Sequence, residues 1–277
     1  MNPVEKAIWY VEGHFAEEIT LDDIAGVAGL SRFYLSRVFG IFAGRSVSSH
    51  IRGRRLTEAA RLLSNGAPDI LSVALNAGYN SHEAFTRAFR DQFGLTPEQV
   101  RAQRHTENIP LVEAIKMDEA FITDLEEPRV ENGKPMLIAG IGERYTCETS
   151  AAIPAQWQRF NPYFGQISGQ VGNVAYGVCC NGDDANNFDY IAGAEVKDFS
   201  DIPDEFARIR IPAQTYLVFS HRKHISTIRS TIMTIWGKWL PESGHVLVDA
   251  PNFERYGPEF DPRTGNGGME IWIPIQN

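Results

Sequence analysis

The sequence predicts two domains of different fold class: an all-α domain with tandem helix-turn-helix units, followed by an α+β domain built on an antiparallel sheet. A motif that occurs twice, about 50 residues apart, predicts the helical domain. Strand-like alternation and a strand-helix-strand-strand layout that occurs twice predict the second domain. A chain of 277 residues is longer than most single cores require. We expect a helical domain at residues 1–107, a linker at residues 108–117 and the α+β domain at residues 118–277.

The repeated motif has the form of a helix-turn-helix unit. Each copy holds an Ala-Gly pair, an apolar residue, a Ser and a short helix that ends in Arg-x-Phe, with a Gly five residues later. One such pattern is a weak signal, but two copies in register within residues 24–97 make a generic helical bundle a poor explanation. The residues that recur at an offset of 50 are Arg37 with Arg87, Phe39 with Phe89, and Gly44 with Gly94.

Local signals place the helices of each unit. Thr20 can cap a helix, with Asp23 as the acidic partner of a capping box. Gly29 ends that helix, because glycine adopts the left-handed conformation without strain, and Ser31 caps the next helix. The corresponding signals of the second unit are Gly78, Ser81 and Thr96-Pro97, and residues 46–63 between the units form one amphipathic helix.

The second helix of each unit carries polar and aromatic side chains that we expect to face away from the core. A helix with an outward arginine near its first turns suits the major groove of DNA. The residues expected to face outward are Arg32, Phe33, Ser36 and Arg37 in the first unit, and His82, Glu83, Thr86 and Arg87 in the second.

The charge distribution supports DNA binding only after the chain is divided. The whole chain has a net charge of −9, which alone argues against nucleic acid. Residues 30–104, however, hold 11 basic and 5 acidic residues, a net charge of +6. This basic segment coincides with the two units, as contact with phosphates requires. We expect the remainder of the chain to be a separate acidic body.

The helical segment resembles the DNA-binding domain of the AraC/XylS family of bacterial transcription regulators. The resemblance covers residues 3–106 and rests on the two motif copies, on residues 51–63, and on Gly94-x-Thr96-Pro97 with Arg101. It implies two recognition helices in successive major grooves of double-stranded promoter DNA. Activation would also require contact with RNA polymerase, which we expect as a partner although no residue pattern indicates where it binds. The resemblance also implies base contacts from Phe33, Ser36, Arg37, His82, Glu83, Thr86 and Arg87, and we expect phosphate contacts from Arg52 and Arg54. Gly40 departs from the basic residue common in the family, so one phosphate contact is expected to be missing.

The second domain alternates strands with helices. Strands are predicted at residues 136–146, 173–181 and 188–196, with a helix at residues 151–164. The set then recurs, with a strand at 206–222 that Pro212 can split, a helix at 224–240, and strands at 253–257 and 268–276. Such a succession predicts an antiparallel sheet with helices on one side.

The second domain resembles the gyrase-inhibitor-like effector domain. The resemblance covers residues 118–277 and rests on the doubled layout, on Tyr190–Val196, on Phe253–Tyr256 and on Met269–Ile275. It implies a cleft that binds a hydrophobic, often cationic small molecule, with Glu254 facing the ligand. We also consider that Glu254 pairs with Arg255 or a surface lysine, and that about half of the candidate aromatic walls are core. The candidates are Trp157, Phe160, Tyr163, Tyr190, Trp236, Trp239, Phe253 and Trp272.

The chain shows no sign of catalysis, cofactor binding or membrane insertion. It lacks a nucleophile elbow, a Walker loop and a His-Glu-x-x-His motif, and its three cysteines fit no metal motif. No N-terminal stretch resembles a signal peptide, so we expect a cytoplasmic protein without cofactor or metal. We interpret the chain as a transcription activator tuned by a small molecule. The alternatives are a second domain that hydrolyses small molecules with Glu254 and Tyr190, or one that docks a protein.

Overall fold

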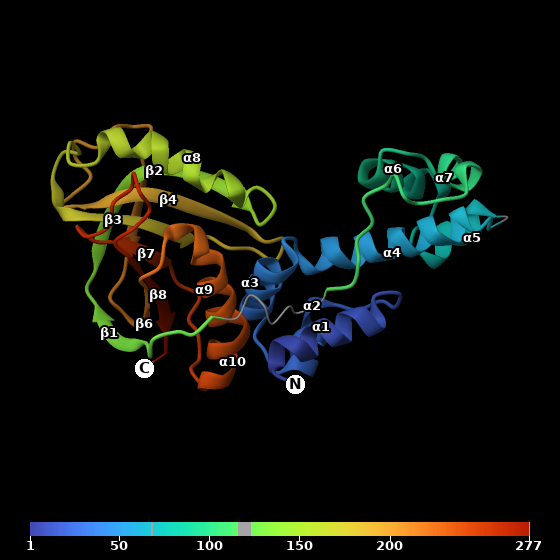
Figure 1. Ribbon diagram of the computed structural model, residues 1–277, viewed down its shortest axis with the longest axis horizontal. Coiled ribbons are helices and arrows are strands. Elements are labelled where there is room, and N and C mark those ends of the chain that lie inside the picture. Colours follow the sequence, from blue (N-terminus) through green and yellow to red (C-terminus); the bar gives the residue numbers. More distant parts are fainter. Residues whose placement is uncertain (68, 116–122, 277) are drawn as a thin grey trace.

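The computed structural model describes residues 1–67, 69–115 and 123–276, with a helical domain at one end and a sheet domain at the other (Figure 1). Both predicted fold classes are confirmed. The helices of the helical domain are α1 (Pro3–His14), α2 (Leu21–Ala28), α3 (Arg32–Ala43), α4 (Val47–Ser64), α5 (Ile70–Asn76), α6 (His82–Phe93) and α7 (Pro97–Gln103).

Capping residues begin and end these helices where the sequence predicted them. Thr20 Oγ1 accepts a hydrogen bond from the Asp23 amide at 3.2 Å, and the Thr20 amide donates to Asp23 Oδ2 at 2.8 Å. Gly29 ends α2 with φ of 70°, and Ser31 caps α3 by accepting from the Tyr34 amide at 3.1 Å. Ser81 and Thr96 cap α6 and α7 in the same way, so the helix boundaries of both units are confirmed.

Two hydrophobic clusters hold the two helix-turn-helix units on opposite ends of α4. The cluster of the first unit joins α1, α2 and α3 around Ile24, Leu35 and Phe39. The cluster of the second unit is built around Phe85 and Phe89 of α6. Figure 1 shows α4 running from the first unit, next to the sheet domain, to the second unit at the far end of the molecule.

The sheet domain holds one antiparallel sheet with the strand order β1-β6-β8-β7-β3-β4-β2-β5. The order is symmetric about its centre, because β7, β8 and β6 occupy the places that β3, β4 and β2 occupy in the other half. The strands are β1 (Arg129–Gly133), β2 (Met136–Thr146), β3 (Gln170–Cys180), β4 (Asn187–Val196), β5 (Ala207–Ile211), β6 (Gln214–His221), β7 (Asn252–Tyr256) and β8 (Met269–Ile275).

The edge strands are the part of this sheet that the sequence did not fully predict. Pro212 splits the predicted strand 206–222 into β5 and β6, as expected. β1 was not predicted, because it is short, polar and mostly exposed and lacks apolar alternation. Each edge strand pairs with the opposite half of the duplication, β1 with β6 and β5 with β2. This exchange ties the two halves into one sheet.

Helices cover the sheet in both halves. The predicted helix at 151–164 is α8 (Ile153–Phe160), flanked by short 3-10 turns. The predicted helix at 224–240 is less regular than expected: α9 (Ile228–Thr234) continues through a π-helical segment (Ile235–Trp239) into α10 (Leu240–Ser243). This irregular helix lies beside α3 (Figure 1).

The expectation that the acidic part forms a separate body is wrong, because the two domains share a hydrophobic core. Val4 and Ile8 of α1, with Tyr34 and Val38 of α3, pack in the same buried cluster as Trp236 of the sheet domain. The Tyr34 hydroxyl also donates a hydrogen bond to the Trp236 carbonyl. The first helix-turn-helix unit is therefore fixed to the sheet domain. Other members of this cluster are Leu217, Phe219, Ile235, Leu240, Met269, Ile271, Ile273 and Ile275.

Candidate DNA-reading helices and ligand cavity

The face of α6 that is predicted to read bases is mostly open to solvent. His82, Glu83 and Arg87 are exposed, and Thr86 is half-buried. The His82 ring lies 3.1 Å from a Glu98 carboxylate oxygen, while Arg87 forms no hydrogen bond or ion pair within the described residues. Three of the four side chains predicted to read bases in the second unit are therefore accessible on one helix face, while the Thr86 hydroxyl is buried without a hydrogen-bond partner among the described residues.

The corresponding face of α3 is partly covered, against expectation: Arg32 stays exposed, whereas Phe33 and Arg37 are half-buried and Ser36 is buried. Arg32 forms ion pairs with Asp22 at 3.0 Å and with Asp184 of the sheet domain at 2.6 Å. Ser36 is only 5% exposed. Arg37 Nη2 donates to Asn252 Oδ1 at 2.9 Å. These side chains do point away from the core of their own unit, but the sheet domain packs on the face that they form.

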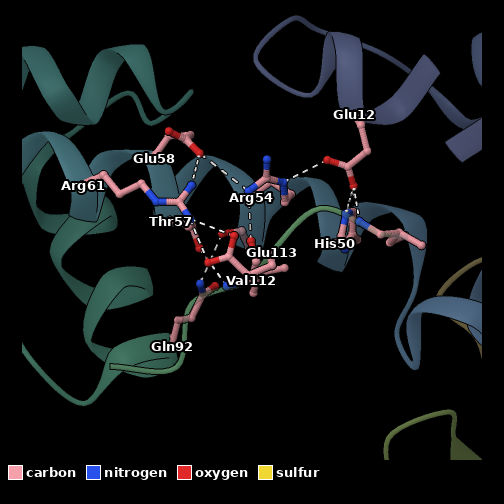
Figure 2. Close-up of polar contacts among 11 residues, drawn as sticks. Glu12, His50, Arg54, Thr57, Glu58, Arg61, Gln92, Val112 and Glu113 are labelled. Atoms are coloured by element: carbon pink, nitrogen blue, oxygen red, sulfur yellow. Dashed lines mark hydrogen bonds and ion pairs between the residues drawn. The ribbon is translucent and has the colours of Figure 1, made fainter. Parts of the chain in front are cut away.

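Arg54 does not occupy the place expected for a phosphate contact. It is 8% exposed, and its Nε donates to Glu12 Oε2 at 3.0 Å. Its Nη1 donates to the Val112 carbonyl at 3.1 Å (Figure 2). Arg52, two residues away on α4, is exposed. Residues two apart lie on different sides of a helix, so Arg54 faces the core while Arg52 can face DNA.

Glu12 holds the centre of this buried network. Its Oε1 also lies 2.8 Å from His50 Nε2 and accepts a hydrogen bond from the Ile115 amide at 3.0 Å. Burial favours the neutral carboxyl, but the hydrogen bonds with His50, Ile115 and Arg54 outweigh that effect and lower the pKa of Glu12. The expected linker is therefore bound to the helical domain up to residue 115, and its last residues, 116 and 117, lie outside the described part of the chain.

A cavity of about 1420 Å³ lies between α3 and the sheet domain. Alternation along β7 brings Glu254 and Tyr256 to the same face of the sheet. Glu254 Oε2 accepts hydrogen bonds from the Tyr190 hydroxyl at 2.7 Å and from the Tyr256 hydroxyl at 3.0 Å. Trp157 Nε1 donates to the Tyr190 hydroxyl at 2.9 Å. A carboxylate thus lies at the end of a hydrogen-bonded chain of aromatic side chains.

Gly177 on β3 makes room for this arrangement. A Cβ at Gly177 would lie 2.0 Å from the Tyr190 hydroxyl oxygen and 2.7 Å from Glu254 Oε2. Burial raises the pKa of Glu254. Hydrogen bonds from Tyr190 and Tyr256 and the positive charge of Arg37 oppose this rise without cancelling it. The carboxylate is therefore costly to keep charged in the free protein, and a cation beside it would relieve that cost.

The cavity brings together part of the predicted ligand-binding set. Glu254, Trp157, Tyr190, Trp236 and Phe253 line it. The other candidates lie outside the lining: Phe160 is fully buried in the sheet core, Tyr163 is 42% exposed and packs on Phe206, Trp239 packs on Phe219, and Trp272 stacks on Phe253. The side chains of these four residues do not face the cavity. The number and type of aromatic residues in the sequence do not show which of them face it.

Several lining residues were not predicted. Tyr256 could have been, because it follows Glu254 by two residues on the same strand and so shares its face. Phe260 lies in the loop that follows and packs on Tyr256. Phe33 and Arg37 of α3 also line the cavity, although the sequence assigned them to DNA. No local pattern in the sequence indicates that residues predicted to contact DNA also line the cavity, because this depends on how the two domains pack.

Two observations concern metals and membranes. Within residues 1–67, 69–115 and 123–276, no group of three or more His, Cys, Asp or Glu side chains is placed to hold a metal ion. A search of the same residues finds no helix with the length and apolar character that a membrane span needs.

Comparison with known proteins agrees with this two-part architecture. Residues 126–276 match the family model of the GyrI-like small molecule binding domain, and residues 24–103 match a helix-turn-helix domain model. Transcriptional regulator Rob of Salmonella typhimurium is 25% identical over 281 residues, which cover 97% of this chain and 96% of that protein. Right origin-binding protein of Escherichia coli K12 is 24% identical over 282 residues, with the same shares.

Solved structures are similar to each part separately. A structure of a protein bound to tetraphenylphosphonium covers 55% of this chain and 95% of its own, with 18% identity and a TM-score of 0.48. An AraC-type regulator from Chromobacterium violaceum covers 38% of this chain and 94% of its own, with 31% identity and a TM-score of 0.36. Because the GyrI-like model matches more than half of the chain, this chain belongs to the family of proteins with a GyrI-like small molecule binding domain, here preceded by an AraC-type helix-turn-helix domain.

Proposed function

We propose that the protein is a cytoplasmic transcription activator that binds promoter DNA and is controlled by a hydrophobic cation in the cavity of its sheet domain. The observation that carries the ligand class is Glu254, a carboxylate that lines an aromatic cavity and forms no ion pair within the described residues. The basic helical segment, the exposed face of α6 and the family relationship support the DNA half of the proposal. Contact with RNA polymerase is part of the proposal, because an activator requires it.

The chemistry of the cavity favours a cation over a neutral or anionic guest. Both tyrosine hydroxyls bind Glu254 Oε2, and no hydrogen bond among the described residues engages Oε1. The rings of Trp157 and Tyr256 meet edge to face at 4.9 Å between centroids, and both line the cavity. A cation placed there would gain Coulomb attraction to the carboxylate and cation–π attraction to the rings.

A calorimetric titration with two ions of the same shape tests the ligand class. Tetraphenylphosphonium and tetraphenylborate differ in charge but hardly in size, so their affinities separate electrostatic from apolar binding. Glu254→Gln keeps the shape and hydrogen-bonding capacity of the side chain but removes its charge. We expect it to weaken tetraphenylphosphonium binding at least tenfold, or about 1.4 kcal/mol. The affinity for tetraphenylborate should not fall.

Arg255→Gln is the matched control. Arg255 is the next residue of β7, but it does not line the cavity and binds Glu270 at 3.3 Å on the other side of the strand. Its substitution changes charge by one unit and should leave both affinities unchanged. Equal phosphonium affinity for Glu254→Gln and the parent protein would reject the cation site, and the sheet domain would then be better explained as a docking module.

A further inference from the structure

The first recognition helix forms one wall of the ligand cavity. Phe33, Arg37 and Gly40 of α3 line it, as Glu254 of β7 does. A Cβ at Gly40 would lie 2.6 Å from Cys147 Sγ of the sheet domain, so the helix backbone itself is in close contact there. The face of α3 predicted to read base edges is therefore the face that closes the cavity.

Arg37 places a cation inside this cavity. Its guanidinium carbon lies 5.0 Å from the centroid of the Trp236 ring, and Nη2 donates to Asn252 Oδ1. Its positive charge acts on Glu254 and opposes the rise that burial causes in the pKa of that carboxyl. A permanently charged group near an aromatic face and a carboxylate is the arrangement that a cationic guest would adopt.

The interactions of Arg37 in the cavity are incomplete. Its Nε is buried without a hydrogen-bond partner, and within the described residues Arg37 forms no ion pair at 4.0 Å or less. A guanidinium that satisfies only part of its hydrogen-bonding capacity away from water is held less firmly than one in a bidentate pair. A cation that fits the aromatic walls better can therefore take its place.

On the basis of the proposed function, we propose that Arg37 is the built-in occupant of the cation site, and that a lipophilic cation binding beside Glu254 displaces it and releases α3 to bind DNA. The arrangement of domains described above is then the self-inhibited state, because α3 cannot enter a major groove while its reading face is covered. Tyr34 and Val38 oppose release, since they would leave the shared core. The effector can shift this equilibrium only by its difference in affinity for the two states.

Thermodynamic linkage determines whether the bound cation raises or lowers the affinity for DNA. If the cation binds the released state more tightly, it must raise the affinity for DNA, and DNA must raise the affinity for the cation by the same factor. A cation that instead bound on top of Arg37 would hold α3 in place and lower the affinity for DNA. The two mechanisms therefore predict opposite signs in one measurement.

A reversible cross-link between α3 and the sheet domain provides that measurement. In Gly40→Cys the added Cβ lies 2.6 Å from Cys147 Sγ, so a disulfide can form once the Asn186 side chain, 2.7 Å from the same Cβ, shifts slightly. Oxidation locks the full-length protein in the closed state, and dithiothreitol unlocks it. We expect the oxidised form to bind tetraphenylphosphonium about tenfold more weakly than the reduced form, or weaker still. We expect a similar loss for a duplex selected from a random-sequence pool with the reduced protein.

Two controls separate the cross-link from side effects of the substitution. Gly40→Ser introduces a side chain of similar size that cannot cross-link, and Gly40→Cys with Cys147→Ser lacks the partner sulfur. Both should show no change on oxidation. A second route needs no cysteine: Asp184→Asn removes the ion pair to Arg32, and should raise DNA affinity severalfold more than Asp204→Asn. Asp204 pairs within the sheet domain, so it reports the effect of the lost charge alone.

The outcomes distinguish this inference from the function on which it rests. Equal affinities of the oxidised and reduced forms for both the cation and the duplex would overturn the displacement mechanism. Tighter cation binding by the oxidised form would overturn it as well, in favour of a ligand that holds α3 closed. Absence of phosphonium binding in both redox forms would reject the proposed effector class, while the duplex measurement would still show whether the closed state blocks DNA.

Discussion

Arg52 and Arg54 show how two residues of the same type on one helix acquire different roles. Both were predicted to touch phosphate, but Arg54 is 8% exposed and bound to Glu12 and Val112, whereas Arg52 is exposed. An arginine in a buried network is required by its partners, because its removal takes a permanent positive charge away from Glu12 and leaves that carboxylate only His50 and the Ile115 amide. An exposed arginine on the same helix is free to contact DNA.

The two arginines should therefore respond differently to truncation. Arg54→Ala should lower the free energy of unfolding by about 3–5 kcal/mol, since it leaves Glu12 short of a partner. Arg52→Ala should change it by less than about 0.5 kcal/mol, but should weaken binding to all DNA sequences alike. Urea denaturation measures the first effect, and binding to specific and random duplexes measures the second. Similar stabilities for the two variants would contradict the role assigned to the Glu12 network.

Glu254 predicts a pH dependence of cation binding. Burial raises its pKa above the ordinary value of 4.5, so the carboxyl begins to take up a proton at a higher pH than an exposed glutamate does. The neighbouring Tyr190, Tyr256 and Cys179 have pKa values raised by burial, that of Cys179 to about 12, so they stay protonated over this range. Phosphonium affinity should therefore be highest above the pKa of Glu254 and fall as the pH drops through that pKa.

Removal of the Arg37 charge supplies the matched comparison for this titration. The positive charge of Arg37 opposes the rise in the Glu254 pKa, so Arg37→Gln should raise this pKa further and move the loss of phosphonium binding to higher pH. At neutral pH the same variant should bind the cation more tightly than the parent, because no internal cation has to leave. Calorimetry between pH 4 and 8 would detect both changes, and a midpoint unmoved by Arg37→Gln would show that the two groups do not interact.

At the scale of elements, α3 and α6 are copies of one motif in different surroundings. Both begin at a capping serine and both end at a glycine with positive φ. The face of α6 is open, whereas the sheet domain covers the face of α3. The repeat therefore determines the helix and its core contacts, while the environment of the outer face depends on a domain elsewhere in the chain.

This asymmetry predicts unequal effects for equivalent substitutions in the full-length protein. Arg87→Ala should lose about 1–3 kcal/mol at a selected duplex, as expected for loss of a base contact. Arg37→Ala should lose less, because it removes a base contact and also a contact that keeps α3 closed. Fluorescence anisotropy with selected and random duplexes would compare them. Full sequence discrimination by Arg87→Ala would mean that α6 clamps the DNA backbone and does not read bases.

At the scale of the molecule, the helical domain is completed by segments outside it. The segment that follows α7 packs on the helical domain: the Val112 amide donates to Thr57 of α4, and the Ile115 amide donates to Glu12. Val112 and Ile109 are each 7% exposed. The first unit shares its core with the sheet domain. A helical fragment cut at residue 107 therefore lacks apolar contacts and hydrogen bonds that the whole chain supplies.

Two fragments should separate these contributions. Residues 1–115 should be more stable than residues 1–107 by about 3 kcal/mol or more, because two buried side chains contribute about 1.5–3 kcal/mol each. The longer fragment carries both recognition helices without the sheet domain, so it should bind DNA as a monomer over roughly 20 base pairs. Footprinting and sedimentation would show this, and a two-fold symmetric footprint that requires a dimer would contradict it. Its DNA affinity should not respond to tetraphenylphosphonium.

Local chemistry in the sequence determined the secondary structure and the fold class. Capping residues such as Thr20 and Ser31, and glycines such as Gly29, act over three or four residues, so they can be recognised without the rest of the chain. The doubled layout of the sheet domain and the position of Glu254 on a strand followed from the same short-range patterns. The polar edge strand β1 was not predicted from the sequence, because it is a strand by virtue of its pairing with β6 and not of its own residues.

Only the tertiary structure decided what the candidate site contains. Which aromatic residues line the cavity depends on how helices and strands face one another, and this excluded Phe160 and Trp272 while it added Tyr256. The position of Arg37 depends on contacts between residues about 200 positions apart, such as Arg37 with Asn252 and Tyr34 with Trp236. Long-range packing of this kind leaves no periodicity in a sequence, because it is the outcome of burying two apolar faces together. The sequence alone thus predicted the helices expected to read DNA and the domain that holds the cavity. The packing of one on the other decided that Arg37, which the sequence assigned to DNA, lines that cavity.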